Sequence, residues 1–275
     1  MSKRPKKILT DSCSESPPRK RVQTAPQSKE ELFAAISKEL KTTSTPGVSQ
    51  FRTDEKTQIV TFIEQNLSGK ADSSTMIVFG QPGLGKTLVL KEVAEQFSAK
   101  TGRRWAKGAR RETTALYINA MNYSNCSRFV EDLADKFDAE KGRPGTQYRL
   151  EALKKALEER VATCAVLLIV DELETLSFHE ADFSFVFDLL SICVSGFVKI
   201  CISNTVELFT PSQDKGVVYL AFRFLVFKPY DTKQLKGVLL ERLQRAGGSQ
   251  ALGVWPESTV EFLVKKTIAS RASDV

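Results

Sequence analysis

The sequence is short of the residues that build several common kinds of functional site. It contains a single histidine, His179, and five cysteines, none of which forms a CxxC pair. One histidine cannot assemble a histidine metal cluster, and an odd number of scattered cysteines favours neither a disulfide framework nor a zinc site. We therefore expect a reducing environment and interpret His179 as a loop residue.

Long apolar runs are also missing. No run reaches the roughly 18 residues that a membrane-spanning helix needs, and the charged N-terminus lacks the apolar stretch of a secretory signal. We therefore expect no membrane partner. The net charge is +7, and the first thirty residues hold eight basic against three acidic side chains. A basic tail on a nearly neutral body favours an address signal or a nucleic-acid arm over a DNA-coating surface.

The N-terminal segment, residues 1–49, is rich in Ser, Thr, Pro and Lys. We expect a disordered basic tail in which only "ELFAAISKEL" suggests a short helix. "KRPKK" and "PPRKR" have the form of a bipartite nuclear localisation signal, which predicts the nucleus; the alternative is a solvated tail without a role. "SPPR" at Ser16 has the form of a cyclin-dependent kinase site, where phosphorylation would add nearly two negative charges.

From residue 50 to residue 230, short apolar runs alternate with segments of helical period. Because the runs are apolar on both faces, they predict the strands of a parallel sheet in an α/β fold. The pattern becomes purely helical after Tyr230, which marks a domain boundary and leaves residues 231–275 as a helical unit. The five predicted strands are "STMIVFG", "ALYINA", "AVLLIVDE", "FVKICISN" and "FRFLVFKP".

The loop "GQPGLGKT" fits the phosphate-binding pattern G-x-x-x-x-G-K-[ST] and stands between a predicted strand and a predicted helix. Its glycines let backbone amides converge on phosphates, and the helix adds its positive N-terminal end. Lys86 would reach the β- and γ-phosphates and Thr87 would bind Mg²⁺, which predicts ATP and Mg²⁺ rather than a dinucleotide. The alternative is a glycine turn without a ligand. The predicted cofactor-binding residues are Gly80, Gln81, Pro82, Gly83, Leu84, Gly85, Lys86, Thr87 and Leu88.

Polar side chains follow two later strands at the edge where ligands bind in open α/β sheets. In "LLIVDELE", Asp171 is placed to hold Mg²⁺ through water and Glu172 to polarise an attacking water. Asn204, at the end of "KICISN", is placed to contact the γ-phosphate or that water. With Lys86 they form the predicted catalytic set; an acidic turn and a capped turn are the structural alternatives.

These motifs resemble those of AAA+ ATPases, with "GQPGLGKT" similar to Walker A, "LLIVDE" to Walker B and "ISN" to sensor 1. Further runs resemble the replication-initiator group, which holds the first subunit of the origin recognition complex and cell division control protein six. "FRTDEKTQIVTFIEQNL", "YINAMN" and "ISNTVEL" are similar to its sequences, and "FKPYDTKQLKGVLLERL" is the most specific match. The two members are not separated by these runs.

The resemblance implies an AAA+ nucleotide-binding core over residues 50–230, a five-stranded parallel sheet of order 5-1-4-3-2, and a helical lid. It also implies ring-like hetero-oligomers with other initiator subunits on double-stranded DNA, loading of the replicative helicase, and slow ATP hydrolysis that depends on partners or DNA. The alternatives are an AAA+ assembly subunit that binds ATP without efficient hydrolysis, and another AAA+ loader of the clamp-loader type.

Three places depart from the family pattern or stand outside it. Tyr219 occupies the position of an arginine that acts on a neighbour's nucleotide, so Arg223 becomes the candidate trans arginine, or else an exposed strand residue. The chain ends where the lid's sensor 2 arginine would follow, so we expect a truncated lid, with Arg271 on the right helix but out of position. The basic stretch from Arg103 to Arg111 surrounds Trp105, which suits either a nucleic-acid backbone or a solvated loop.

Overall fold

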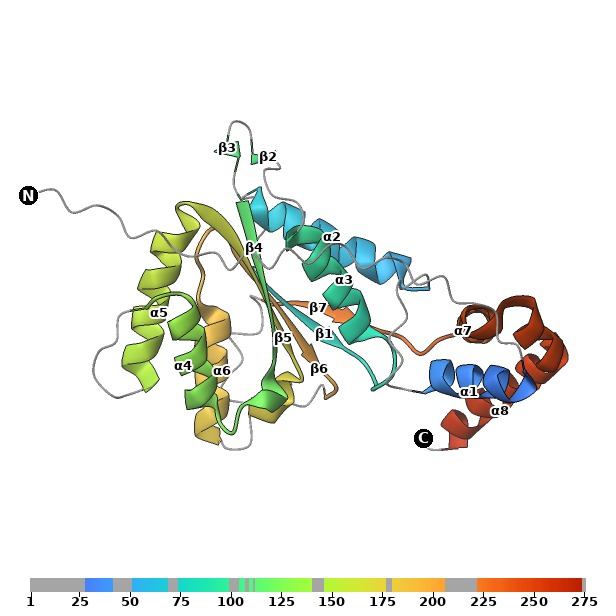
Figure 1. The fold of residues 1–275 in the computed structure, drawn as a ribbon. Helices are drawn as coiled ribbons and strands as arrows, with labels where there is room; N and C mark the ends of the chain where they lie inside the picture. The colour runs from blue at the N-terminus through green and yellow to red at the C-terminus, as the bar shows by residue number, and fades with distance from the viewer. Residues whose placement is uncertain are drawn as a thin grey trace, which may run out of the picture.

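The computed structural model describes residues 28–41, 51–68, 74–98, 104–106, 109–110, 112–139, 146–176, 180–205 and 222–273. Figure 1 shows an α/β core in which a sheet lies between two groups of helices, with further helices extending beyond one end of the core. None of the helices in these ranges is both long enough and apolar enough to span a bilayer.

The sheet has the predicted topology. Its five strands lie in the order β4-β5-β6-β1-β7 and all neighbours are parallel. Numbered by their succession within this sheet, they read 2-3-4-1-5, which is the predicted order seen from the other edge. All residues of β1, β5 and β6 are buried, as expected for strands covered on both faces. The strands are β1 (Thr75–Phe79), β4 (Glu112–Asn119), β5 (Cys164–Asp171), β6 (Phe197–Ser203) and β7 (Phe222–Val226).

Helices cover both faces of the sheet. On one face, α2 (Thr53–Leu67) and α3 (Lys86–Ser98) pack against Leu167 and Ile169 of β5. On the other, α4 (Cys126–Lys136), α5 (Thr146–Val161) and α6 (Glu180–Ser191) pack against Val166, Leu168 and Val170. Alternate residues of one strand thus serve two separate cores, which explains why the sequence of β5 shows no polar alternation. The short 3₁₀ helices η1 (Ala120–Asn122) and η2 (Leu173–Leu176) follow β4 and β5.

The lid consists of α7 (Thr232–Val254) and α8 (Glu257–Ser273). A capping box between Asp231 and Gln234 starts α7, because each side chain binds the other's backbone N–H. Non-helical backbone at Gly247 and Gly248 interrupts α7, and the φ of +57° at Gly248 is one that glycine adopts readily. The helical character predicted after Tyr230 is therefore confirmed.

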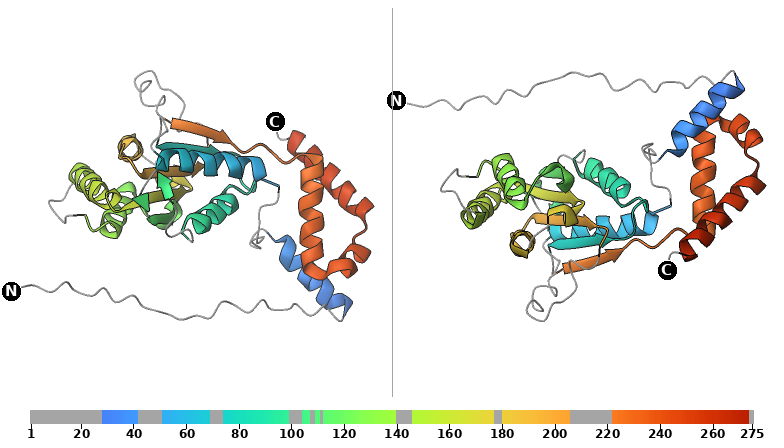
Figure 2. Two further views of the ribbon diagram at one scale, coloured as in Figure 1. Left: turned by 90° about the horizontal axis from the view of Figure 1, so that it is seen from above. Right: turned by 90° about the horizontal axis from the view of Figure 1, so that it is seen from below.

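One segment of the N-terminal tail forms the short helix that "ELFAAISKEL" suggested. Helix α1 (Lys29–Leu40) forms there, with a capping box between Ser28 and Glu31. Leu32 and Ile36 are buried in a cluster with apolar residues of α7 and α8, so burial against the lid stabilises a helix too short to persist alone. Figure 2 shows α1 lying across α7 in both views. The localisation signal and Ser16 lie outside the described residues.

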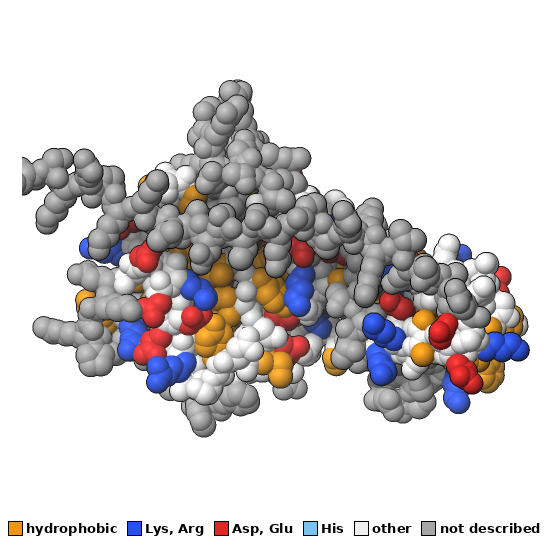
Figure 3. All heavy atoms as spheres, in the orientation of Figure 1, with side chains coloured by type: hydrophobic (Ala, Val, Ile, Leu, Met, Phe, Trp, Pro, Cys, Tyr) orange, Lys and Arg blue, Asp and Glu red, His pale blue; other side chains and the backbone are white. Residues whose placement is uncertain are grey.

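The basic stretch forms a hairpin rather than a simple loop. Strands β2 (Arg104–Ala106) and β3 (Ala109–Arg110) pair antiparallel there. The side chains of this hairpin lie outside what the structure describes, so their contact with a nucleic-acid backbone stays a prediction. Elsewhere the surface is mixed, since Figure 3 shows Lys and Arg interspersed with Asp and Glu over α4, α5 and the lid on the face drawn. This pattern agrees with a nearly neutral body.

A lysine buried in the core makes stability depend on pH. Lys199 of β6 is fully buried, and its Nζ donates to the carbonyl oxygen of Ile192. Burial lowers its pKa from 10.5 to about 8. Between pH 8 and 10.5 the unfolded chain then holds a proton that the folded chain lacks, so stability rises with pH. Burial raises the pKa of the Cys201 thiol from 9.0 to about 12, which opposes this rise above pH 9.

We therefore expect the free energy of unfolding to increase between pH 8 and 9, by about 1 kcal/mol per pH unit. A Lys199→Met variant should lack this increase, because the titrating group is gone. Urea denaturation of both proteins across this range measures the difference, with Lys154→Met on the exposed face of α5 as the control. Parallel pH profiles for the Lys199→Met and unmodified proteins would contradict the assignment.

Candidate nucleotide-binding site

The loop between β1 and α3 has the backbone that phosphate binding requires. Gly80, Gly83 and Gly85 have φ values of +153°, +80° and +86°, which favour glycine. Gly80 also has no room for a side chain, since an added Cβ would lie 2.8 Å from the carbonyl oxygen of Phe227. Helix α3 begins at Lys86, so its N-terminal amides and its dipole are directed at the loop.

Lys86 is held at the centre of the site. It is only 5% exposed, and its Nζ donates to the carbonyl oxygens of Gly80 and Gln81 at 2.5 and 3.0 Å and to Oδ1 of Asn204 at 2.7 Å. Burial lowers the pKa of Lys86, while three nearby carboxylates oppose that shift. The ammonium group therefore lies between the phosphate loop and the end of β6. A phosphate bound there can accept the hydrogen bonds that Lys86 now donates to the protein.

Asp171 connects the loop to β5. It is 1% exposed, and its Oδ2 accepts hydrogen bonds from Thr87 Oγ1 at 2.8 Å and from the Tyr117 hydroxyl. Its Oδ1 accepts the backbone N–H of Glu172 at 3.0 Å. Burial, with the hydrogen bond to Asp171, raises the pKa of Tyr117, so this hydroxyl stays a donor at neutral pH. Thr87 and Asp171 are thus joined directly, one at the start of α3 and the other at the end of β5.

Glu172 and Asn204 meet across the ends of β5 and β6. Nδ2 of Asn204 donates to Glu172 and to Glu174, each at 2.7 Å. Glu172 has a φ of +55°, an uncommon conformation for a residue with a side chain, and such strain clusters at functional sites. Burial, followed by the charges of Glu174 and Asp171, raises the pKa of Glu172. This carboxyl group therefore exchanges its proton at a higher pH than an ordinary glutamate.

The structure brings the predicted catalytic set together. Asp171 and Glu172 lie at the end of β5, Asn204 follows β6, and Lys86 begins α3 after the glycine loop. The hydrogen bonds above join these four residues. Among the predicted loop residues, Leu84 is buried while Gln81, Pro82 and Gly83 are exposed. The candidate trans arginine is not part of this cluster: Arg223 is exposed on edge strand β7, opposite Met76 near the start of β1. Its predicted role is untested, and Tyr219 and His179 lie outside the described residues.

Sequence reasoning missed two members of the site. Tyr117 pairs with Ile169, two residues before Asp171, so its side chain shares a face with that carboxylate. Strand alternation could have indicated this. Glu174 lies in η2, and the backbone N–H of Asn204 donates to its Oε1 at 3.1 Å. Its role as a partner of Asn204 depends on the turn at Glu172, which the sequence pattern does not reveal.

These residues fit a magnesium–triphosphate group. Among the residues that the structure describes, no group of three or more His, Cys, Asp or Glu forms a metal site made of protein ligands alone. Mg²⁺ with phosphates needs no such cage, because phosphate oxygens and waters supply most of its ligands. One hydroxyl beside one buried carboxylate, as at Thr87 and Asp171, is the protein contribution that such a site requires.

Comparison with known proteins shows which family this chain resembles. A family model for an AAA domain matches residues 70–203. The ORC1-type DNA replication protein 1 of Archaeoglobus fulgidus is 27% identical over 211 residues, covering 74% of this chain and 48% of that protein. The chain spans about half the length of the curated relatives it matches.

Solved structures share the fold. The Aeropyrum pernix ORC1 protein, solved in complex with DNA, superimposes with a TM-score of 0.59 at 20% identity, covering 75% of this chain and 53% of that one. A chain of Drosophila ORC bound to DNA gives a TM-score of 0.59 at 22% identity, covering 91% of this chain and 60% of that one. Together with the initiator-like runs and the observed strand order, these matches make the chain similar to AAA+ proteins of the ORC1/Cdc6 type.

Proposed function

We propose that this chain binds ATP with Mg²⁺ and hydrolyses it as a subunit of the origin-recognition and helicase-loading machinery. The observation that carries the proposal is a pair of hydrogen bonds at the start of α3: Lys86 donates to Asn204 at the end of β6, and Thr87 donates to Asp171 at the end of β5. Magnesium-bound ATP supplies an activated γ-phosphoryl group for transfer to water. The chain's own residues bind the phosphates and orient the attacking water.

Each side chain has a distinct task in this proposal. Lys86 redirects its donors from the loop carbonyls to the β- and γ-phosphates, while Thr87 and Asp171 hold Mg²⁺, the latter through water. Glu172, in its ionised form, accepts a hydrogen bond from the attacking water. Asn204 already contacts both Lys86 and Glu172, so it links the phosphate loop to the catalytic carboxylate.

A second candidate is an assembly subunit that binds ATP but hydrolyses it poorly. It is favoured by the engagement of Glu172 with Asn204, because a carboxylate held by an amide is less available to water. The raised pKa of Glu172 points the same way, since a protonated carboxyl group cannot act as a base.

The proposed partners follow from the family. They are other initiator AAA+ subunits in a ring-like hetero-oligomer, double-stranded DNA and the replicative helicase, with the nucleus as the proposed location. The archaeal and Drosophila structures above are of proteins bound to DNA. In the tail, Ser16 is the proposed kinase site, because phosphorylation there would reduce the charge of the adjacent "PPRKR" cluster.

Calorimetric titration of ATP with Mg²⁺, followed by phosphate-release assays with and without duplex DNA, tests the proposal. Saturable binding with hydrolysis that DNA stimulates is the expected result. Binding with no turnover under either condition would favour the assembly subunit. No binding of ATP at millimolar concentration would overturn both functions, while binding of GTP in preference to ATP would overturn the assigned nucleotide.

A further inference from the structure

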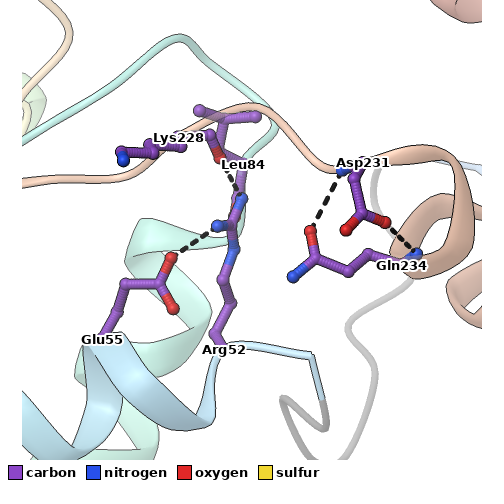
Figure 4. Close-up of polar contacts among 6 residues, drawn as sticks. All are labelled: Arg52, Glu55, Leu84, Lys228, Asp231 and Gln234. Atoms are coloured by element: carbon purple, nitrogen blue, oxygen red, sulfur yellow. Dashed lines mark hydrogen bonds and ion pairs between the residues drawn. The ribbon is translucent and has the colours of Figure 1, made fainter.

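The Arg52 side chain is buried between three parts of the chain. It stands at the N-terminal end of α2 and is 2% exposed. Its Nε donates to the carbonyl oxygen of Leu84 at 3.2 Å, and one terminal nitrogen donates to that of Lys228 at 2.7 Å. The other terminal nitrogen forms an ion pair with Glu55 at 2.6 Å. Figure 4 shows the guanidinium group pointing from the start of α2 toward Leu84 and Lys228.

Aromatic rings complete this environment. The guanidinium carbon lies 3.9 Å from the ring centroid of Tyr230 and 5.3 Å from that of Phe227. A buried arginine is costly unless its donors are matched, and here each of the three nitrogens has an acceptor. Phe227 and Tyr230 lie in the link between β7 and α7. Arg52 therefore contacts both the backbone of this link, at Lys228, and its aromatic rings.

The two acceptor carbonyls belong to different parts of the structure. Leu84 lies inside the glycine loop, between Gly83 and Gly85. Lys228 lies three residues before Asp231, the residue that caps α7 and thus begins the lid. Arg52 therefore holds the phosphate loop and the link to the lid with one rigid group, a geometry that the planar guanidinium suits and a lysine ammonium does not.

The link also lies against the loop at other points. The backbone N–H of Phe227 donates to the carbonyl oxygen of Phe79 at 2.7 Å, directly before Gly80. The hydroxyl of Tyr230 would lie 3.2 Å from a Cβ added at Gly85. These contacts extend from Phe79, directly before the loop, to Gly85 within it. A change in the direction of the link between β7 and α7 therefore changes the packing around the loop.

One peptide unit gives this contact a consequence for ligand binding. In a trans peptide the C=O and the following N–H point in opposite directions. Because Arg52 holds the Leu84 carbonyl, the N–H of Gly85 is directed away from Arg52. Losing the guanidinium would free this peptide to rotate, and the glycine neighbours offer little resistance to that rotation.

We propose that Arg52 is a positioning residue that sets the Leu84–Gly85 peptide for phosphate binding and couples it to the orientation of the lid. The part concerning phosphate rests on the proposed ATP site. The coupling between loop and lid depends only on the contacts of Arg52 with the two carbonyls and with Tyr230. Nucleotide in the loop and the direction of α7 are then set together.

The test uses Arg52→Lys, which keeps the charge but cannot bridge both carbonyls, and Tyr230→Leu, which removes the ring from the side of the lid. Tyr230→Phe keeps the ring and is the matched control for the second variant. Arg128→Lys, on the exposed face of α4, is the control for the first. All are made in the full chain, and circular dichroism establishes which ones fold.

Two readouts separate positioning from simple stability. The first is the Kd for ATP with Mg²⁺ by calorimetry. The second is the core-to-lid distance distribution by electron spin resonance, using labels at Lys155→Cys on α5 and Lys266→Cys on α8, both exposed positions. Cys13, in the N-terminal segment, and the exposed Cys193 are replaced as Cys13→Ser and Cys193→Ser. We expect Arg52→Lys to weaken ATP binding about 10-fold, or 1.4 kcal/mol, and to broaden the distance distribution. Tyr230→Leu should broaden it similarly, while Tyr230→Phe and Arg128→Lys should change neither.

The outcomes are distinguishable. A lower Tm in Arg52→Lys with unchanged Kd and unchanged distances would make the residue merely structural and overturn the proposal. If Arg52→Lys does not fold, Tyr230→Leu decides by the same criteria. If the unmodified chain binds no ATP, the proposed function fails, but the distances still decide the coupling: broadening in the variants supports it, and identical distributions overturn it.

Discussion

A Lys86→Ala variant is expected to bind ATP at least 100-fold more weakly than the unmodified chain. Lys86 is the cation at the centre of the loop, and a charge-assisted contact to phosphate contributes several kcal/mol when it is partly buried. The dipole and amides of α3 remain, so residual binding comes from the backbone alone. Calorimetric titration with ATP and Mg²⁺ measures the loss directly.

The variant also removes three hydrogen bonds inside the protein, to Gly80, Gln81 and Asn204. A Lys86→Met variant, which keeps the aliphatic stem, separates loss of charge from loss of packing. The control is Lys154→Ala, an exposed lysine of α5 on the opposite layer of the core. Binding within threefold of the unmodified chain in both Lys86 variants would remove Lys86 from the phosphate site.

Much of the core was predictable because its signals are local. Strands β1, β5 and β6 are buried along their whole length, and a continuous apolar run bounded by turns is the sequence mark of such strands. The polar residues at their carboxyl ends then share one edge of the sheet by the rules of parallel topology. This is why Asp171 and Asn204 could be placed near Lys86 before their contacts were known.

The parts that escaped prediction depend on contacts between distant segments. The sequence suggested a short helix at α1 but not its packing, because its partners lie more than two hundred residues away in α7 and α8. The roles of Tyr117 and Arg52 likewise depend on which carboxylate or carbonyl each side chain meets. An Arg beside Glu55 in "FRTDE" shows only a local ion pair, and its acceptors at Leu84 and Lys228 appear only in the folded chain.

A Glu172→Gln variant is expected to lower the rate of ATP hydrolysis by about 100-fold or more while leaving ATP binding within a fewfold of the original, since general-base catalysis contributes roughly 10²–10⁴. The amide keeps the size of the side chain and can still pair with Asn204, but it cannot accept a proton from water. Because burial raises the pKa of Glu172, the acid limb of the rate profile should lie above the ordinary 4.5 of a glutamate.

Phosphate release measured from pH 5 to 8, with duplex DNA present, tests both statements. The rate should rise with pH as Glu172 ionises, and this rise should disappear in Glu172→Gln.

Glu174 is the rival base, because Asn204 Nδ2 donates to it and to Glu172 at the same distance of 2.7 Å. If Glu172→Gln hydrolyses ATP normally and Glu174→Gln does not, Glu174 is the catalytic base. Glu158→Gln, exposed on α5, controls for the loss of one carboxylate. Glu172 is the favoured base because it follows the buried Asp171 directly and has a left-handed backbone conformation of the kind found at functional sites.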